Sequence, residues 1–104
     1  MLTREQAHEL LDLCLDINGD EKRQRSKTGE LPTTFFYFSG HTCEVDISVH
    51  ENGWEPNANA DKDLTVYFNE VYGDRYEEVK DYLLQLKKMT AELQLETVKS
   101  NYIE

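Results

Sequence analysis

Residues 42–50 alternate strictly between apolar and polar side chains, and this alternation constrains the fold more than any other feature of the chain. The apolar positions are Cys43, Val45, Ile47 and Val49. A period of two over such a length is typical of a half-buried β-strand. The aromatic run at residues 35–38 comes just before it and has a high β propensity. Together the two segments predict a β-hairpin.

Gly40 indicates how this hairpin turns. Glycine at the first central position favours a two-residue type II′ turn, because that position needs a positive φ. The register that follows opposes Ser39 with Thr42, Phe38 with Cys43, Tyr37 with Glu44, Phe36 with Val45, and Phe35 with Asp46. Opposed residues share one face of a sheet. One face is therefore apolar, whereas the other combines Phe35 and Tyr37 with the carboxylates.

A helix is predicted over residues 3–18. Thr3 and Gln6 have the spacing of a capping box, and Gly19 suits the C-terminal end. The apolar side chains recur at helical spacing, so they form a stripe that faces the core. This stripe consists of Ala7, Leu10, Leu11, Cys14 and Leu15, widened by Leu13 and Ile17.

A third strand and a long helix follow the hairpin. Residues 64–69 alternate, with Tyr67 on the outer face. Asp74 as N-cap, with Glu77 behind it, begins a helix that runs to about residue 99. Such a helix is longer than a strand, so it overhangs the sheet, and either the first helix or a second copy of the chain must cover the overhang. The overhanging residues are Leu93, Leu95, Val98, Tyr102 and Ile103.

We therefore expect an α+β fold with the order α-β-β-β-α, in which a three-stranded antiparallel meander carries the long C-terminal helix on one face. Residues 1–104 are expected to form a single domain. The N-terminus has no pattern of a signal peptide, and no apolar run is long enough to span a bilayer, which favours a cytoplasmic protein.

Two loops admit alternative interpretations. Residues 20–31 hold a basic cluster that suits a phosphate contact or an import signal, but a solvated linker is favoured because no aromatic residue interleaves. Residues 57–63 alternate oxygen-bearing side chains as a calcium loop does. They lack the glycine and glutamate that an EF-hand requires, so a polar loop is expected. Trp54 is expected to cap the edge of the core rather than to act as an exposed anchor.

No set of residues indicates catalysis, and we expect no enzyme, no cofactor and no metal site. Cys43 with His41 or His50 comes nearest to a nucleophile and base, but Cys43 alternates into the core while the histidines lie in the turn and on the outer face. Cys14 and Cys43 are expected to be buried, reduced thiols.

The charge is concentrated in the middle of the chain. The net charge is −10, and residues 44–81 carry eleven acids against three bases. A surface of this sign repels nucleic acid and anionic membranes, so the expected partner is a basic protein. The residues predicted to bind that partner are Phe35, Tyr37, Glu44, Asp46, Glu51, Glu55, Asp61, Asp63 and Tyr67.

Two classes of function follow. The first is a small acidic protein-binding module, an inhibitor or nucleic-acid mimic that occupies a basic surface of its partner, for example a nucleic-acid-binding enzyme. Carboxylates would replace phosphates and rings would replace bases, and binding would weaken with salt. The alternative is a homodimeric structural or assembly protein that uses the outer sheet face or the overhanging helix, so the chain is either a monomer or a homodimer. An origin in a phage or mobile element suits such a protein by association only.

Overall fold

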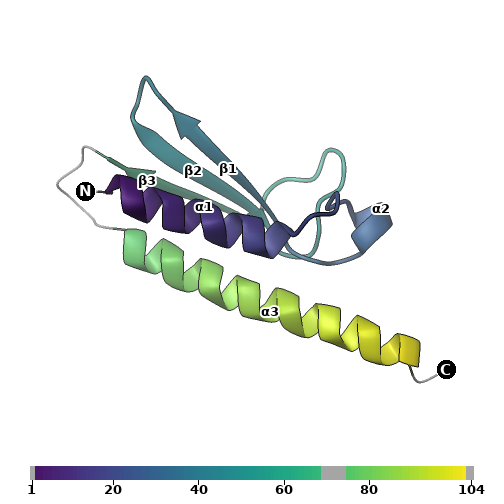
Figure 1. Ribbon diagram of the computed structural model, residues 1–104. Helices are drawn as coiled ribbons and strands as arrows, with labels where there is room; N and C mark the ends of the chain where they lie inside the picture. The colour runs from purple at the N-terminus through teal and green to yellow at the C-terminus, as the bar shows by residue number, and fades with distance from the viewer. Residues whose placement is uncertain (1, 69–74, 103–104) are drawn as a thin grey trace.

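The computed structural model describes residues 2–68 and 75–102, with side chains through residue 96 of the last helix. It confirms the predicted α+β class and the order of the main elements (Figure 1), with one short additional helix, α2, in the first loop. The elements are α1 (Arg4–Asn18), α2 (Arg25–Thr28), β1 (Thr33–Ser39), β2 (Glu44–His50), β3 (Lys62–Tyr67) and α3 (Tyr76–Tyr102).

The three strands form the predicted antiparallel meander in the order β1-β2-β3. α1 lies against β1, and α3 packs against α1 (Figure 1), so the long helix joins the core largely through its helical neighbour. The core combines Leu10 and Ile17 of α1, Ile47 and Val49 of β2, and Leu83 of α3, all of which are completely buried. The apolar face of the sheet is therefore the inner face, as the alternation predicts.

The predicted register of the hairpin was wrong by two residues. Ser39 pairs with Glu44 and Phe38 pairs with Val45. The loop has four residues instead of two, because Cys43 rather than Gly40 takes the positive φ, of 56°. The Cys43 N–H closes the loop by donating to the Ser39 carbonyl at 2.8 Å. A shift of two residues keeps every side chain on its predicted face, since the side-chain period of a strand is two.

The predicted capping box of α1 is confirmed. The Gln6 N–H donates to the Thr3 hydroxyl at 3.1 Å, and the Thr3 N–H donates to the Gln6 side chain at 3.0 Å. The predicted stripe was partly wrong, because Leu15 is 57% exposed while Leu13 is buried. α1 packs against α3 as well as against β1, and this second contact turns its buried face toward Leu13.

Asn18, the last residue of α1, pairs with the backbone of the edge strand β1. Its Nδ2 donates to the Thr34 carbonyl at 2.9 Å, and its Oδ1 accepts the Thr34 N–H at 2.8 Å. The Thr34 hydroxyl donates to the same Oδ1 at 3.1 Å. One amide side chain therefore replaces the ladder partner that an edge strand lacks.

α3 runs parallel to α1 and continues beyond it. Lys80 lies 3.7 Å from Glu9, and Lys87 lies 3.0 Å from Asp16, so α1 ends beside the middle of α3. With 27 residues against 15, α3 extends about three turns further. Leu95 in this extension is 54% exposed, so the predicted overhang is present and α1 does not cover it.

Some element boundaries differ from the predicted ones, and others lie outside the described residues. β3 begins two residues earlier than predicted and ends at Tyr67. The predicted strand end at Asn69, the N-cap Asp74 and Ile103 lie outside the described residues, as do the side chains of Val98 and Tyr102. Within the described ranges, no helix is both long and apolar enough to cross a membrane.

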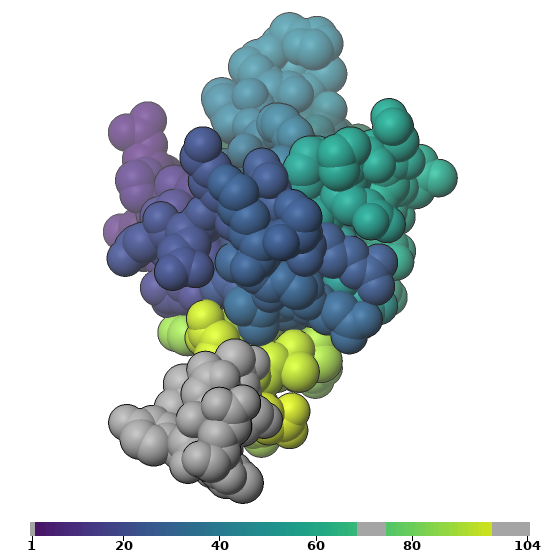
Figure 2. Space-filling model, turned by 90° about the vertical axis from the view of Figure 1, so that its right-hand side faces the viewer, coloured from purple at the N-terminus to yellow at the C-terminus, as the bar shows by residue number. Residues whose placement is uncertain are grey.

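The loop between α1 and β1 and the loop between β2 and β3 lie side by side at one end of the molecule (Figure 2). The Arg25 N–H donates to the Trp54 carbonyl at 2.7 Å and joins them. The Arg23 guanidinium donates to the Ile17 carbonyl at 3.0 Å and so caps the end of α1. Burial lowers the pKa of Arg23 from its usual value. At least one member of the basic cluster, Arg23, therefore has a structural role at the end of α1.

Candidate functional site

The outer sheet face brings six of the nine predicted binding residues together. Three rows of paired residues cross β1, β2 and β3 on this face. They are Phe35–Ser48–Asp63, Tyr37–Asp46–Thr65 and Ser39–Glu44–Tyr67. We use the name outer face for Phe35, Tyr37, Glu44, Asp46, Asp63 and Tyr67. The pairing of these rows places acids and aromatic rings in adjacent positions on one surface.

The outer face carries two aromatic rings on β1 and one on β3. The rings of Phe35 and Tyr37 are stacked, with centroids 6.4 Å apart and planes 5° from parallel. Phe35 is half-buried because the rings of His50 and Trp54 make T-shaped contacts with it, with centroids 5.8 Å and 6.5 Å away. Tyr37 is 55% exposed and Tyr67 is 39% exposed. Trp54 thus supports an outer-face ring rather than capping the core, and His50, which lies on the outward side of β2 as predicted, is buried beside that ring.

Each acid of the outer face accepts a hydrogen bond from a neutral hydroxyl. Thr65 donates to Asp46 at 2.7 Å, and Ser48 donates to Asp63 at 2.8 Å. Thr42 donates to Glu44 at 2.7 Å. These bonds orient the carboxylates without neutralising their charge. The alternation of the strands already places Ser48 and Thr65 on this face, but no pattern in the sequence marks their hydroxyls as partners of the acids.

No lysine or arginine occupies the outward positions of the three strands. Lys62 is next to Asp63 in β3, but it points the other way, and its ammonium lies 5.5 Å from the centre of the Tyr82 ring on α3. The carboxylates of the outer face therefore have no cationic partner within their own surface. Neighbouring carboxylates that lack a cationic partner attract a basic surface.

The other three predicted acids serve the loop that follows β2. Glu51 accepts the Tyr82 hydroxyl at 2.6 Å, and Asp61 accepts the Glu51 N–H at 2.7 Å. Glu55 lies 3.5 Å from Arg25. Burial raises the pKa of Tyr82 well above its usual range, and the Glu51 carboxylate adds to this shift. Each of these three acids therefore has a partner in the loops or on α3, and none of them belongs to a strand of the sheet.

The cysteines occupy different surroundings. Cys14 is buried as predicted, and burial raises the pKa of its thiol. Cys43 is only half-buried, because it lies in the hairpin loop ahead of β2 and not in the strand. Among the described residues, no group of three or more histidines, cysteines or acids is placed to hold a metal ion.

Comparisons with protein-family models, with curated proteins and with solved structures find no match to this chain.

Proposed function

We propose that this protein is an acidic protein-binding module whose outer face occupies a basic surface of a partner protein. The observation that carries the proposal is the combination of oriented, unneutralised carboxylates with exposed tyrosines on one sheet face. Glu44 and Asp46 follow each other on the same side of β2, about 7 Å apart. Tyr37 and Tyr67 flank them and offer apolar contact area with a polar tip.

A basic groove that normally receives nucleic acid has the chemistry to match this surface. Its arginines and lysines would meet the carboxylates where phosphates otherwise lie, and the tyrosine rings would take the place of bases. The module would then act as an inhibitor that competes with nucleic acid. Association of this kind is fast and weakens as salt screens the charges.

The test begins with capture of partners on the immobilised protein at about 50 mM and about 500 mM salt. The captured protein is then purified, and its affinity is measured with and without competing nucleic acid. The double variant Glu44→Lys with Asp46→Lys should weaken binding about 100-fold at the lower salt concentration. A matched control is Glu92→Lys with Glu96→Lys, which changes the net charge equally at exposed positions on α3.

A second pair of variants separates the two faces of β1. Tyr37 and Phe38 are neighbours with nearly equal exposure, 55% and 57%, but they point to opposite faces. Tyr37→Ser should weaken capture and Phe38→Ser should not. Binding that survives the charge reversal, or that ignores both salt and nucleic acid, would contradict the proposal.

The overhang of α3 supports a second candidate, a homodimeric assembly protein. Leu95 and Met89 are 54% and 40% exposed on the part of α3 near and beyond the end of α1. A second copy of this helix would cover them, as in a short coiled coil. Leu95→Glu should then convert a salt-insensitive dimer to a monomer in sedimentation experiments. Leu15→Glu, at a leucine of α1 that is 57% exposed, should leave the dimer intact. A protein that is monomeric at every concentration would exclude this candidate.

A further inference from the structure

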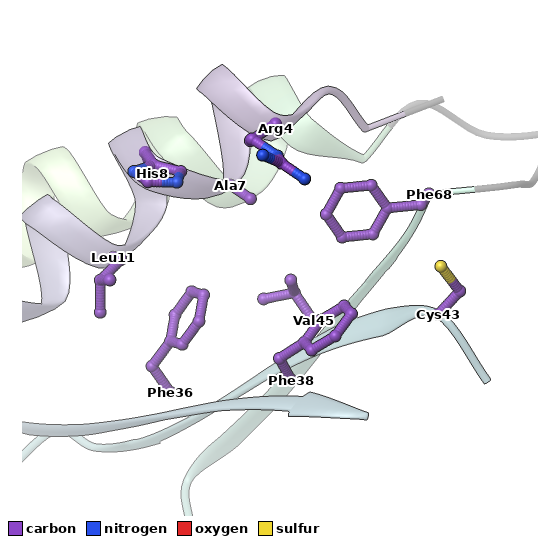
Figure 3. A pocket seen from close by; sticks show the side chains of 9 residues that line it. All are labelled: Arg4, Ala7, His8, Leu11, Phe36, Phe38, Cys43, Val45 and Phe68. Carbon is purple, nitrogen blue, oxygen red and sulfur yellow. The ribbon is translucent and has the colours of Figure 1, made fainter. Parts of the chain in front are cut away.

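An apolar groove opens on the inner side of the sheet, between α1 and the tip of the β1–β2 hairpin. Figure 3 shows its side chains facing one space, and its volume is about 410 Å³. Phe38 belongs to the inner face, yet 57% of it is exposed, because the hairpin extends past the helices there. The groove is thus a part of the core face that no described element covers.

The walls of the groove are almost entirely apolar. Phe36, Phe38 and Val45 come from the hairpin, Phe68 follows β3, and Leu11 comes from α1. The rings of Phe38 and Phe68 meet edge to face, with centroids 5.8 Å apart and planes at 85°. Small-molecule sites combine such walls with few polar groups, and they fall in this range of volume.

Arg4 and His8 carry the strongly polar groups at the groove, and the Cys43 thiol is only weakly polar. They lie one helical turn apart on α1, in line with Ala7 and Leu11 (Figure 3). Within the described part of the chain, Arg4 has neither a hydrogen-bond nor an ion-pair partner for its guanidinium. In a protein of net charge −10, an unpaired arginine beside an apolar groove is well suited to bind an anionic ligand group.

We propose that this groove binds an aliphatic monocarboxylate of medium chain length. The tail would lie among Phe36, Phe38 and Phe68, and the carboxylate would accept hydrogen bonds from Arg4 and His8 at the rim. From Arg4 to Leu11 the helix rises by about 10 Å, which matches a medium aliphatic chain and not a long one. This site is on the opposite side of the sheet from the outer face, so it does not rest on the proposed function.

Decanoate is a suitable probe, and the thiol of Cys43 reports on its binding because Cys43 lines the groove. A ligand of this size binds with a dissociation constant of about 1 mM at ordinary ligand efficiency. Decanoate at about 5 mM should therefore slow the alkylation of Cys43 by iodoacetamide about sixfold. Cys14 is buried and should stay unreactive throughout.

Decyltrimethylammonium has the same tail with the opposite charge and should give little protection. Equal protection by this cation, or no protection by decanoate, would overturn the proposal. Alkylation of Cys14 in the presence of decanoate would also overturn it, because that outcome identifies decanoate as a denaturant of the protein.

Two exposed positions test the separate halves of the site. Arg4→Gln should weaken decanoate binding about fivefold, whereas Lys88→Gln, the same charge change at an exposed position of α3, should not. Phe38→Ser should weaken it to a similar extent, whereas Tyr37→Ser on the other side of β1 should not. Unchanged affinity in both groove variants would show that the probe binds elsewhere.

Discussion

Replacing Asn18 with alanine tests whether one side chain completes the edge of the sheet. The substitution removes three hydrogen bonds to Thr34, at 2.8 Å, 2.9 Å and 3.1 Å. Each such bond contributes about 0.5–1.5 kcal/mol net, and Thr34 is only 3% exposed, so water replaces them poorly. Alanine recovers about 0.5 kcal/mol through its higher helix propensity. The free energy of unfolding should therefore fall by about 2 kcal/mol.

Urea unfolding followed by circular dichroism measures this loss. With a slope of about 1 kcal/mol per molar urea, the midpoint should fall by about 2 M. Asn59→Ala, at an exposed loop position, should change the free energy of unfolding by less than about 0.5 kcal/mol. A loss for Asn18→Ala as small as that of the control would refute the idea that the amide acts as a ladder partner.

Asn18→Asp extends the same test to pH. The carboxylate keeps the acceptor for the Thr34 N–H, but it loses the donor and sets a negative oxygen against the Thr34 carbonyl. The folded protein should therefore favour the neutral acid and raise the pKa of the new aspartate above its usual value of about 4. The loss of unfolding free energy relative to the original protein is therefore complete at neutral pH. It disappears as the pH falls through the raised pKa toward about 4. A penalty independent of pH would contradict the geometry.

Three further outcomes are expected. Gly53→Ala should destabilise the protein by about 2 kcal/mol in urea unfolding, because φ is +93° and a Cβ would lie 2.5 Å from a carbonyl oxygen of the neighbouring loop. Gly40→Ala, with no atom within 4 Å of the added Cβ, should be neutral, and equal effects would refute this reasoning. Iodoacetamide at about pH 8 should modify Cys43 and spare Cys14 until the protein unfolds, since burial raises the pKa of the Cys14 thiol; equal rates would disprove its burial. Burial and a carboxylate partner raise the pKa of Tyr82, so it should contribute a late-ionising component to an ultraviolet titration, and stability should fall as the pH rises past about 10. Tyr82→Phe should reduce that late component by one tyrosine, and an unchanged component would refute the raised pKa of Tyr82.

The hairpin shows how far the sequence determined the structure. Alternation determines which face each side chain takes, and Phe36 and Phe38 lie on the apolar face as predicted. The pairing of the strands depends on the turn between them. The turn was predicted from Gly40, but the positive φ is at Cys43, a residue type that rarely adopts it. The error of two residues left the faces intact only because two is the period of a strand.

The acids illustrate the opposite case. Glu44 and Asp46 were placed by alternation, and the structure brings them together on one surface. Glu51, Glu55 and Asp61 were grouped with them by charge alone. Their carboxylates accept from Tyr82, pair with Arg25 or close a loop, and such contacts between distant parts of the chain leave no local pattern. The same reason explains why Leu15 was assigned to the core, because the contact between α1 and α3 decides which leucines are buried.

The parallel pairing of α1 with α3 also bears on how the chain folds during synthesis. The meander joins strands that follow one another, so its contacts are local and can form early. α1, in contrast, finds its helical neighbour only after residue 76 onward has left the ribosome. Until then Leu13, which lies beside Leu84 of α3, lacks this cover, and the nascent chain exposes apolar surface that attracts other chains. The last helix therefore closes the core, and its arrival ends the period in which the chain is most prone to aggregate.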